Sequence, residues 1–163
     1  MPRAYLSVGS NIEREHHVRS ALKSLRERFG ELIVSRVFES EAVGFAGDDF
    51  FNLVVGFDCD ASVFEVVAGL REIELAHSRD RRAPRFSPRT LDLDLLLYGD
   101  LVMDEHGIRL PRDEITRYAF VLGPLAEIAG EMRNPLDGRR FADMWREFDQ
   151  ASQAMRPVEI DIG

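Results

Sequence analysis

The chain has 163 residues, of which 45% are hydrophobic and 31% charged, and its formal net charge at pH 7 is −8. This length and composition are typical of one globular domain, which we expect to span residues 1–163, and they exclude a chain too polar to bury a core. The excess of acid argues against binding to nucleic acid, which depends on neutralising phosphates with positive side chains.

The N-terminal part of the chain predicts a strand followed by an amphipathic helix. Residues 4–8 lead into the turn Gly9-Ser10-Asn11. From Val18 to Phe29, apolar residues then recur at the three- and four-residue spacing of a helix, and Gly30 ends that helix.

Two strands and a second helix follow. Residues 32–38 and 50–57 are rich in β-branched and aromatic side chains, and residues 39–49 form the loop that joins them. The helical spacing of apolar residues returns from Val63 to Ile73.

The remaining elements complete a recognisable order. Residues 91–98 predict the next strand, so the order is β-α-β-β-α-β, which is typical of an α+β, ferredoxin-like fold with helices packed on one face of an antiparallel sheet. Residues 120–128 and 141–148 predict two extra C-terminal helices. The pattern of residues 156–163 does not decide between a strand and a disordered tail.

Composition also indicates where the protein acts and which kinds of site it contains. Cys59 is the single cysteine, so no disulfide can form within the chain, and a cytoplasmic location is expected. No apolar stretch approaches the roughly 18 residues that cross a bilayer, so we expect no membrane partner. The histidines show no metal-ligand spacing and are predicted to lie in solvent: His16, His17, His77 and His106.

Two carboxylates lie two positions apart inside the apolar strand at residues 91–98. Asp92 and Asp94 alternate with leucines, so in an extended chain both acids face one way, about 6 to 7 Å apart. Such a pair can reach the same pair of metal ions. The alternative is an edge strand with both acids simply in water.

An arginine-rich segment precedes the acid pair and favours the metal interpretation. Between residues 79 and 89 there is one acid, Asp80, beside five arginines: Arg79, Arg81, Arg82, Arg85 and Arg89. The planar guanidinium binds phosphate oxygens bidentately and keeps its charge. Arginines that lead directly into two carboxylates predict a site for a polyphosphate and its Mg²⁺.

The segment Arg85-x-Ser-Pro-Arg89-x-x-Asp92-Leu-Asp94 resembles the signature of the 6-hydroxymethyl-7,8-dihydropterin pyrophosphokinases. These folate-pathway enzymes move the terminal diphosphate of ATP onto a pterin alcohol. Three further segments resemble the same family in the same order: residues 5–11, 49–52 and 119–128. The resemblance implies ATP and a pterin alcohol as small-molecule substrates, and we expect a monomer.

The resemblance also implies roles for charged residues. Asp92 and Asp94 would hold two Mg²⁺ ions that bridge the ATP phosphates. Arg79 and Arg89 match the family's catalytic arginines. Three residues match nucleotide-site positions, although the first also fits an exposed helix residue: Glu74, Arg81 and Arg85.

A pterin is a flat polar heterocycle, for which aromatic stacking and a few fixed hydrogen-bonding groups are expected. Phe50 and Phe120 match the family's stacking positions and Asn52 the group that reads the ring edge; without the resemblance, both phenylalanines would be predicted as core. Ser40 and Val43 match loop contacts to the ring, and Phe86 takes the place of an aromatic that closes over the substrate.

The chain departs from the family pattern at Arg112, Asp113 and Tyr118, where the family usually places nucleotide contacts. Arg112 and Arg117 are therefore predicted to bind ATP in their stead. The same departures keep an alternative open, a divergent paralogue that binds a pterin or a nucleotide without this catalysis, or that uses a related pterin alcohol.

Overall fold

The computed structural model describes residues 1–41, 48–77 and 91–163. In these ranges the main sheet has six antiparallel strands in the order β5-β1-β4-β3-β8, with β2 also paired to β4. A separate hairpin is formed by β6 and β7. The strands are β1 (Arg3–Ser10), β2 (Ile33–Val34), β3 (Val37–Ser40), β4 (Phe50–Asp58), β5 (Asp92–Tyr98), β6 (Met103–Glu105), β7 (Ile108–Leu110) and β8 (Met155–Val158).

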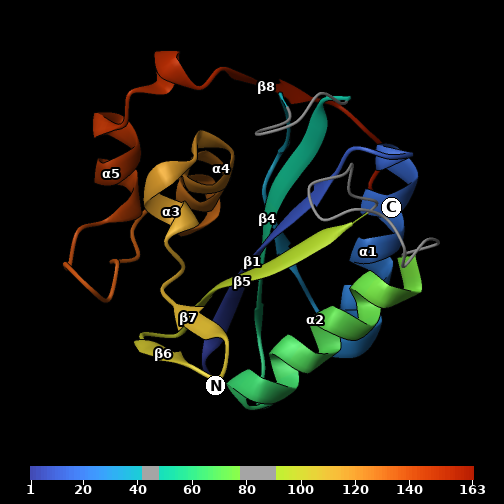
Figure 1. Cartoon of the computed structure of the whole chain (residues 1–163), viewed down its shortest axis with the longest axis horizontal. Coiled ribbons are helices and arrows are strands. Elements are labelled where there is room, and N and C mark those ends of the chain that lie inside the picture. The colour runs from blue at the N-terminus through green and yellow to red at the C-terminus, as the bar shows by residue number, and fades with distance from the viewer. Residues whose placement is uncertain (42–47, 78–90) are drawn as a thin grey trace.

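Helices cover both faces of the sheet, as Figure 1 shows. On one face lie α1 (Arg14–Phe29) and α2 (Val63–His77). On the other lie α3 (Glu114–Arg117), α4 (Ala119–Ala129) and α5 (Phe141–Glu147), with the short 3₁₀ helix η1 (Gln150–Ser152) after them. The predicted ferredoxin-like order is confirmed, and the C-terminal helices add a layer to the face that this order leaves bare.

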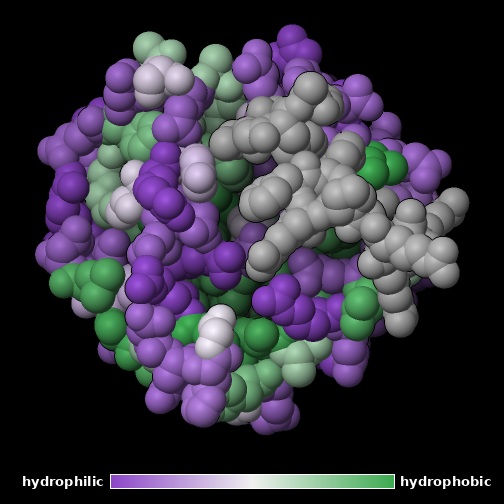
Figure 2. Space-filling view, in the orientation of Figure 1, coloured by the Kyte–Doolittle hydropathy of each residue, from purple (hydrophilic) through white to green (hydrophobic). Residues whose placement is uncertain are grey.

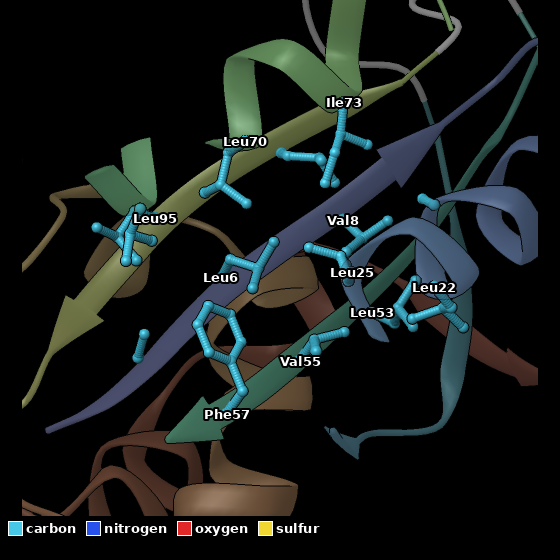
Figure 3. Packing of buried hydrophobic residues seen from close by; sticks show 14 of the residues in the cluster. Leu6, Val8, Leu22, Leu25, Leu53, Val55, Phe57, Leu70, Ile73 and Leu95 are labelled. Carbon is cyan, nitrogen blue, oxygen red and sulfur yellow. The ribbon is translucent and has the colours of Figure 1, made fainter. Parts of the chain in front are cut away.

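The first core lies between the sheet and helices α1 and α2 (Figure 3). Alternate strand positions point into it, because successive side chains of a strand face opposite ways. Its members include Leu6, Val8, Leu53, Val55 and Phe57 from the strands and Leu22, Leu25, Leu70 and Ile73 from the helices. Fully burying a side chain of this size is worth about 1.5 to 3 kcal/mol, so this layer, the larger of the two cores, contributes strongly to the stability of the fold.

The second core lies under α4 and α5 and covers only part of the opposite face. It contains Tyr5 and Val54 from the sheet, with Leu122, Leu125 and Phe141 from the helices. The C-terminal end of β1 and the N-terminal end of β5 lie outside this cluster, and the candidate site residues occur there.

The strand predicted at residues 32–38 is broken at Ser35. The hydroxyl of Ser35 accepts a hydrogen bond of 2.9 Å from the backbone amide of Val54, so a side chain replaces a ladder partner and separates β2 from β3. At the other end of the chain, β8 pairs with β3 and thereby makes the undecided tail a strand up to Val158.

Two of the histidines are not in solvent, so that prediction is wrong for them. His17 and His77 are 3% and 9% exposed, and their rings lie 5.4 Å apart where α1 meets α2. The ring nitrogens of His77 lie 2.8 Å from the carbonyl of Ile73 and 2.8 Å from the hydroxyl of Ser20. These local partners make burial tolerable, which a spacing rule for metal ligands does not detect. Across the described residues, no helix is long and apolar enough to cross a membrane.

Candidate functional site

Cross-strand pairing places the candidate residues in one row across the sheet. Gly9 on β1 pairs with Asn52 on β4 and with Asp92 on β5. Directly paired residues share a face, so Asn52 and Asp92 lie on either side of a residue without a side chain. Two strand spacings separate them, about 10 Å.

The next row repeats the arrangement. Ser7 on β1 pairs with Val54 and with Asp94, and Val54 belongs to the core beneath α4. The acids and Asn52 therefore face the same side as α3 and α4. In Figure 2, hydrophilic side chains on the visible face border a hollow in which apolar side chains are seen.

The two aspartates of β5 are partly exposed, in alternation with the buried residues Leu91, Leu93 and Leu95. The side chain of Asp94 is 37% exposed, and its Oδ1 lies 3.6 Å from Nη2 of Arg112. Arg112 also donates to Glu114. A guanidinium thus lies beside one of the two acids.

Glu74 reaches the same strand from α2. Its carboxylate accepts a hydrogen bond of 3.0 Å from the backbone amide of Leu93 and lies 3.3 Å from Arg71. Burial raises the pKa of this carboxyl above its usual value, and the negative charge of Asp94 acts in the same direction. The alternative of a fully exposed helix residue is excluded, since the side chain is only 17% exposed.

A narrow groove of about 30 Å³ lies at the outer edge of β5, between α2 and the β6–β7 hairpin. This groove could not be predicted from the sequence, because the hairpin and α2 lie side by side only in the folded chain. Its lining combines apolar, acidic and basic side chains: Val67, Leu70, Arg71, Leu93, Asp94, Leu95, Gly107, Ile108, Arg109 and Arg112. Arg117 does not line it, since its guanidinium donates to Glu114 at 3.0 Å and lies over the ring of Tyr118.

The candidate pterin contacts come from two parts of the fold, which we call the Ser40 wall on the sheet (Ser40, Phe50 and Asn52) and the aromatic wall at the start of α4 (Tyr118 and Phe120). On the sheet, Nδ2 of Asn52 donates to the hydroxyl of Ser40 at 2.6 Å, and both residues are buried. Phe50 pairs with Ser40 on the same face and is half-buried. On the helical side, Phe120 is the second residue of α4, and its ring stacks on Tyr118 with centroids 5.0 Å apart.

Gly9 forms the floor between these residues and the acids. A Cβ atom there would lie 3.2 Å from Oδ1 of Asn52 and 3.7 Å from the ring of Phe50. Gly9 is not among the glycines with positive φ, so its backbone conformation does not require glycine. The lack of a side chain at Gly9 instead leaves open the space above the sheet beside Asn52 and Phe50.

Six candidate residues lie outside the described ranges, and the structure places none of them: Val43, Arg79, Arg81, Arg85, Phe86 and Arg89. Among the described residues, no group of three or more His, Cys, Asp and Glu side chains is arranged to hold a metal ion. Any metal at Asp92 and Asp94 therefore needs ligand atoms from elsewhere.

Comparisons with known proteins agree on one family. Residues 5–130 match the model of the family described as 7,8-dihydro-6-hydroxymethylpterin-pyrophosphokinase. The 2-amino-4-hydroxy-6-hydroxymethyldihydropteridine pyrophosphokinase of Pseudomonas aeruginosa is 35% identical over 87% of this chain and 89% of its own length. The protein of that name from Bacillus subtilis is 32% identical over 79% of each chain.

Solved structures with the same fold are more distant in sequence. A structure described as HPPK-DHPS in complex with substrates has a TM-score of 0.71 at 10% identity, covering 92% of this chain and 44% of its own. Wild-type Plasmodium falciparum HPPK-DHPS with pteroate has a TM-score of 0.70 at 12% identity, covering 90% and 42%. The chain spans less than half of these larger proteins, and the likeness is one of fold.

Proposed function

The chain belongs to the 7,8-dihydro-6-hydroxymethylpterin-pyrophosphokinase family, and on this premise we propose how its residues transfer diphosphate from ATP to 6-hydroxymethyl-7,8-dihydropterin. The products are the pterin diphosphate and AMP. The hydroxyl of the pterin must meet the β-phosphorus in line, so catalysis depends on positioning and on neutralising the charge of phosphate oxygens.

The row Asn52–Gly9–Asp92 is the observation that carries the proposal. The ring edge of the pterin would be read by Asn52 and Ser40, with Phe50 and Phe120 against its faces. The bare floor at Gly9 lets the hydroxymethyl arm cross β1 toward the acids. The separation of about 10 Å between the ends of the row suits a bicyclic ring with a short arm.

The acid pair fits Mg²⁺. This ion is satisfied by one or two carboxylates when phosphate oxygens and water complete its octahedron, so the lack of a third protein ligand among the described residues is compatible with it. We assign two Mg²⁺ ions to Asp92 and Asp94. Bound there with ATP, they would neutralise the charge that develops on phosphate oxygens.

The groove along β5 is the proposed nucleotide site. Because this groove is only about 30 Å³, the base would have to widen it to lie against the half-buried Val67, whereas Leu70 is buried in the core beneath. Arg112 lies where phosphates would approach Asp94. Beside the groove, the carboxylate of Glu74 holds the backbone of β5 through its hydrogen bond from the Leu93 amide. Arg117 is a more distant ATP contact in this proposal, and Arg79, Arg81, Arg85 and Arg89 keep their proposed phosphate roles, with Val43 and Phe86 at the pterin.

We also propose that the protein is a monomer and acts in the cytoplasm. AMP release from MgATP, measured with and without 6-hydroxymethyl-7,8-dihydropterin, tests the reaction. AMP that forms only with both substrates supports it.

A second candidate is a paralogue that binds without catalysis, which the contact of Arg112 with a proposed metal ligand favours. Calorimetric heat on adding pterin or nucleotide, without AMP, would select that candidate. A panel of related pterin alcohols separates a change of substrate from a loss of catalysis.

A further inference from the structure

The segment from η1 to β8 crosses from the helical layer to the edge of the sheet (Figure 1). Gln153 lies in the middle of this segment, and its side-chain amide contacts two backbone groups at once. Its Nε2 donates to the carbonyl of Arg117 at 2.9 Å, and its Oε1 accepts from the amide of Ala119 at 2.9 Å.

These two groups are the end of α3 and the beginning of α4. The last carbonyls and first amides of a helix have no partner within the helix, so they need partners elsewhere. Gln153 supplies both from a segment more than 30 residues away in sequence. Between them lies Tyr118, on which Phe120 stacks, so Gln153 fixes the backbone that carries the aromatic wall.

The other end of the segment is attached to the sheet wall. In β8, Met155 pairs with Ser40 and Arg156 pairs with Glu39. The carboxylate of Glu39 is 8% exposed and accepts from Arg156, while Nη2 of Arg14 lies 2.8 Å from it. Burial opposes the ionised form, and the two arginines outweigh it, holding the pKa of Glu39 below its usual value.

The second arginine extends this attachment toward Phe50. Arg14 donates to the carbonyl of Asp49, which directly precedes Phe50, at 2.8 Å. Residues 150–158 thus hold the aromatic wall at one end and the Ser40 wall at the other. They lie beyond residues 5–130, which match the family model. A cleft of about 720 Å³ lies between the segment, helices α4 and α5 and the β3 edge, lined by Phe38, Gly123, Trp145 and Met155 among others.

We infer that residues 150–158 form a strap that sets the distance between the two walls, and that Gln153 is a positioning residue for the pterin, acting through the α3–α4 junction on Phe120. This inference rests on the proposed function of the site. A strap of this kind affects pterin binding more than nucleotide binding, because the groove along β5 lies at the opposite edge of the sheet. Gln153 contacts only the main chain of Arg117, whose guanidinium, the proposed distant ATP contact, is held separately by Glu114.

The test uses Gln153→Ala in the full chain, with Gln150→Ala as a matched control. Gln150 is in the same segment, but its side chain donates to the carbonyl of Trp145 on α5 and not to the α3–α4 junction. Loss of the two hydrogen bonds of Gln153 is expected to raise the pterin KM about tenfold and to leave the MgATP KM within about twofold. Gln153→Glu keeps the acceptor for Ala119 but sets a carboxylate oxygen against the carbonyl oxygen of Arg117, so its pterin KM should rise at least as much as that of Gln153→Ala.

Amide hydrogen exchange over residues 117–122 provides a readout that does not depend on turnover. Exchange should accelerate in Gln153→Ala and stay at the wild-type rate in Gln150→Ala. If exchange accelerates while the pterin KM is unchanged, Gln153 is merely structural and the inference is wrong. It is equally wrong if both substrates lose affinity alike, or if Gln150→Ala has the same effect. A wild-type chain that forms no AMP would instead remove the proposed function, while exchange would still report whether Gln153 holds the junction.

Discussion

The side chain of Asn52 donates a hydrogen bond of 2.6 Å to the hydroxyl of Ser40 across the β3–β4 pair. Both residues are buried, so the hydroxyl holds the amide at a fixed angle above the sheet. The remaining hydrogen-bonding capacity of the amide is available for the edge of a ring. In the proposed function, these two residues on neighbouring strands act as one recognition group.

Asn52→Ala should weaken pterin binding more than Ser40→Ala does. The first change removes the group that reads the ring and leaves the Ser40 hydroxyl without this partner, a loss of about 1 to 3 kcal/mol, or roughly 5- to 150-fold in the pterin Kd. The second leaves the amide in place but less constrained. Fluorescence titration with the pterin measures both, and equal or negligible losses would contradict the assignment.

Gly9→Ala should reduce pterin affinity without unfolding the sheet. The added methyl group would enter the floor 3.2 Å from the Asn52 amide oxygen, and the backbone at Gly9 has no positive φ to strain. A pterin KM raised about tenfold, with the MgATP KM unchanged, is expected.

Gly56→Ala provides the contrasting control for Gly9→Ala. Its Cβ would lie 2.7 Å from the ring of Tyr5, in the packed interior of the sheet. This variant should lower the Tm and leave the pterin KM of the folded fraction unchanged. The interpretation of Gly9 fails if its variant shows the same pattern.

Arg112→Ala should weaken MgATP more than pterin. Arg112 lies 3.6 Å from Asp94 and lines the groove along β5, whereas Arg146 on α5 is exposed and contacts Asp143. Loss of a charged phosphate contact is expected to raise the MgATP KM roughly tenfold. Arg146→Ala serves as the control and should change neither KM. A normal MgATP KM in Arg112→Ala would exclude the arginine from the nucleotide site.

The stability of Glu74→Gln relative to the wild type should depend on pH. Burial raises the pKa of Glu74 in the folded state above the unfolded value of about 4.5. The wild-type fold therefore has its full stability from the protonated carboxyl below that value, and it loses this stability as the pH rises through the folded-state pKa. The Tm advantage of Glu74→Gln should therefore be small at pH 4 and larger at pH 7. A Tm difference between the two proteins that stays constant or shrinks with rising pH would show that the pKa of Glu74 is not raised in the folded state.

The part of the fold carried by side-chain periodicity could be predicted from the sequence. Alternation in residues 91–98 correctly placed the leucines in the core and the two aspartates on the opposite face, since the period of two is local. The helices at residues 120–128 and 141–148 were also predicted correctly from local patterns.

Features that depend on distant segments could not be predicted in this way. The register that sets Gly9 between Asn52 and Asp92 depends on three strands at once, and the break at Ser35 depends on the amide of Val54. Gln153 has no local pattern that points to the α3–α4 junction. The histidine prediction failed for the same reason, because burial of His17 follows from α1 packing against α2.

Whether Asp92 and Asp94 hold two divalent ions is tested most directly by counting Mn²⁺, a paramagnetic substitute for Mg²⁺, on the chain saturated with a non-hydrolysable ATP analogue. The wild type should bind two Mn²⁺ per chain, seen in the electron paramagnetic resonance spectrum as a coupled pair. Asp92→Asn and Asp94→Asn should each retain at most the one ion that the nucleotide carries. Two tightly bound, coupled ions in both variants would contradict the assignment of these aspartates as the metal ligands.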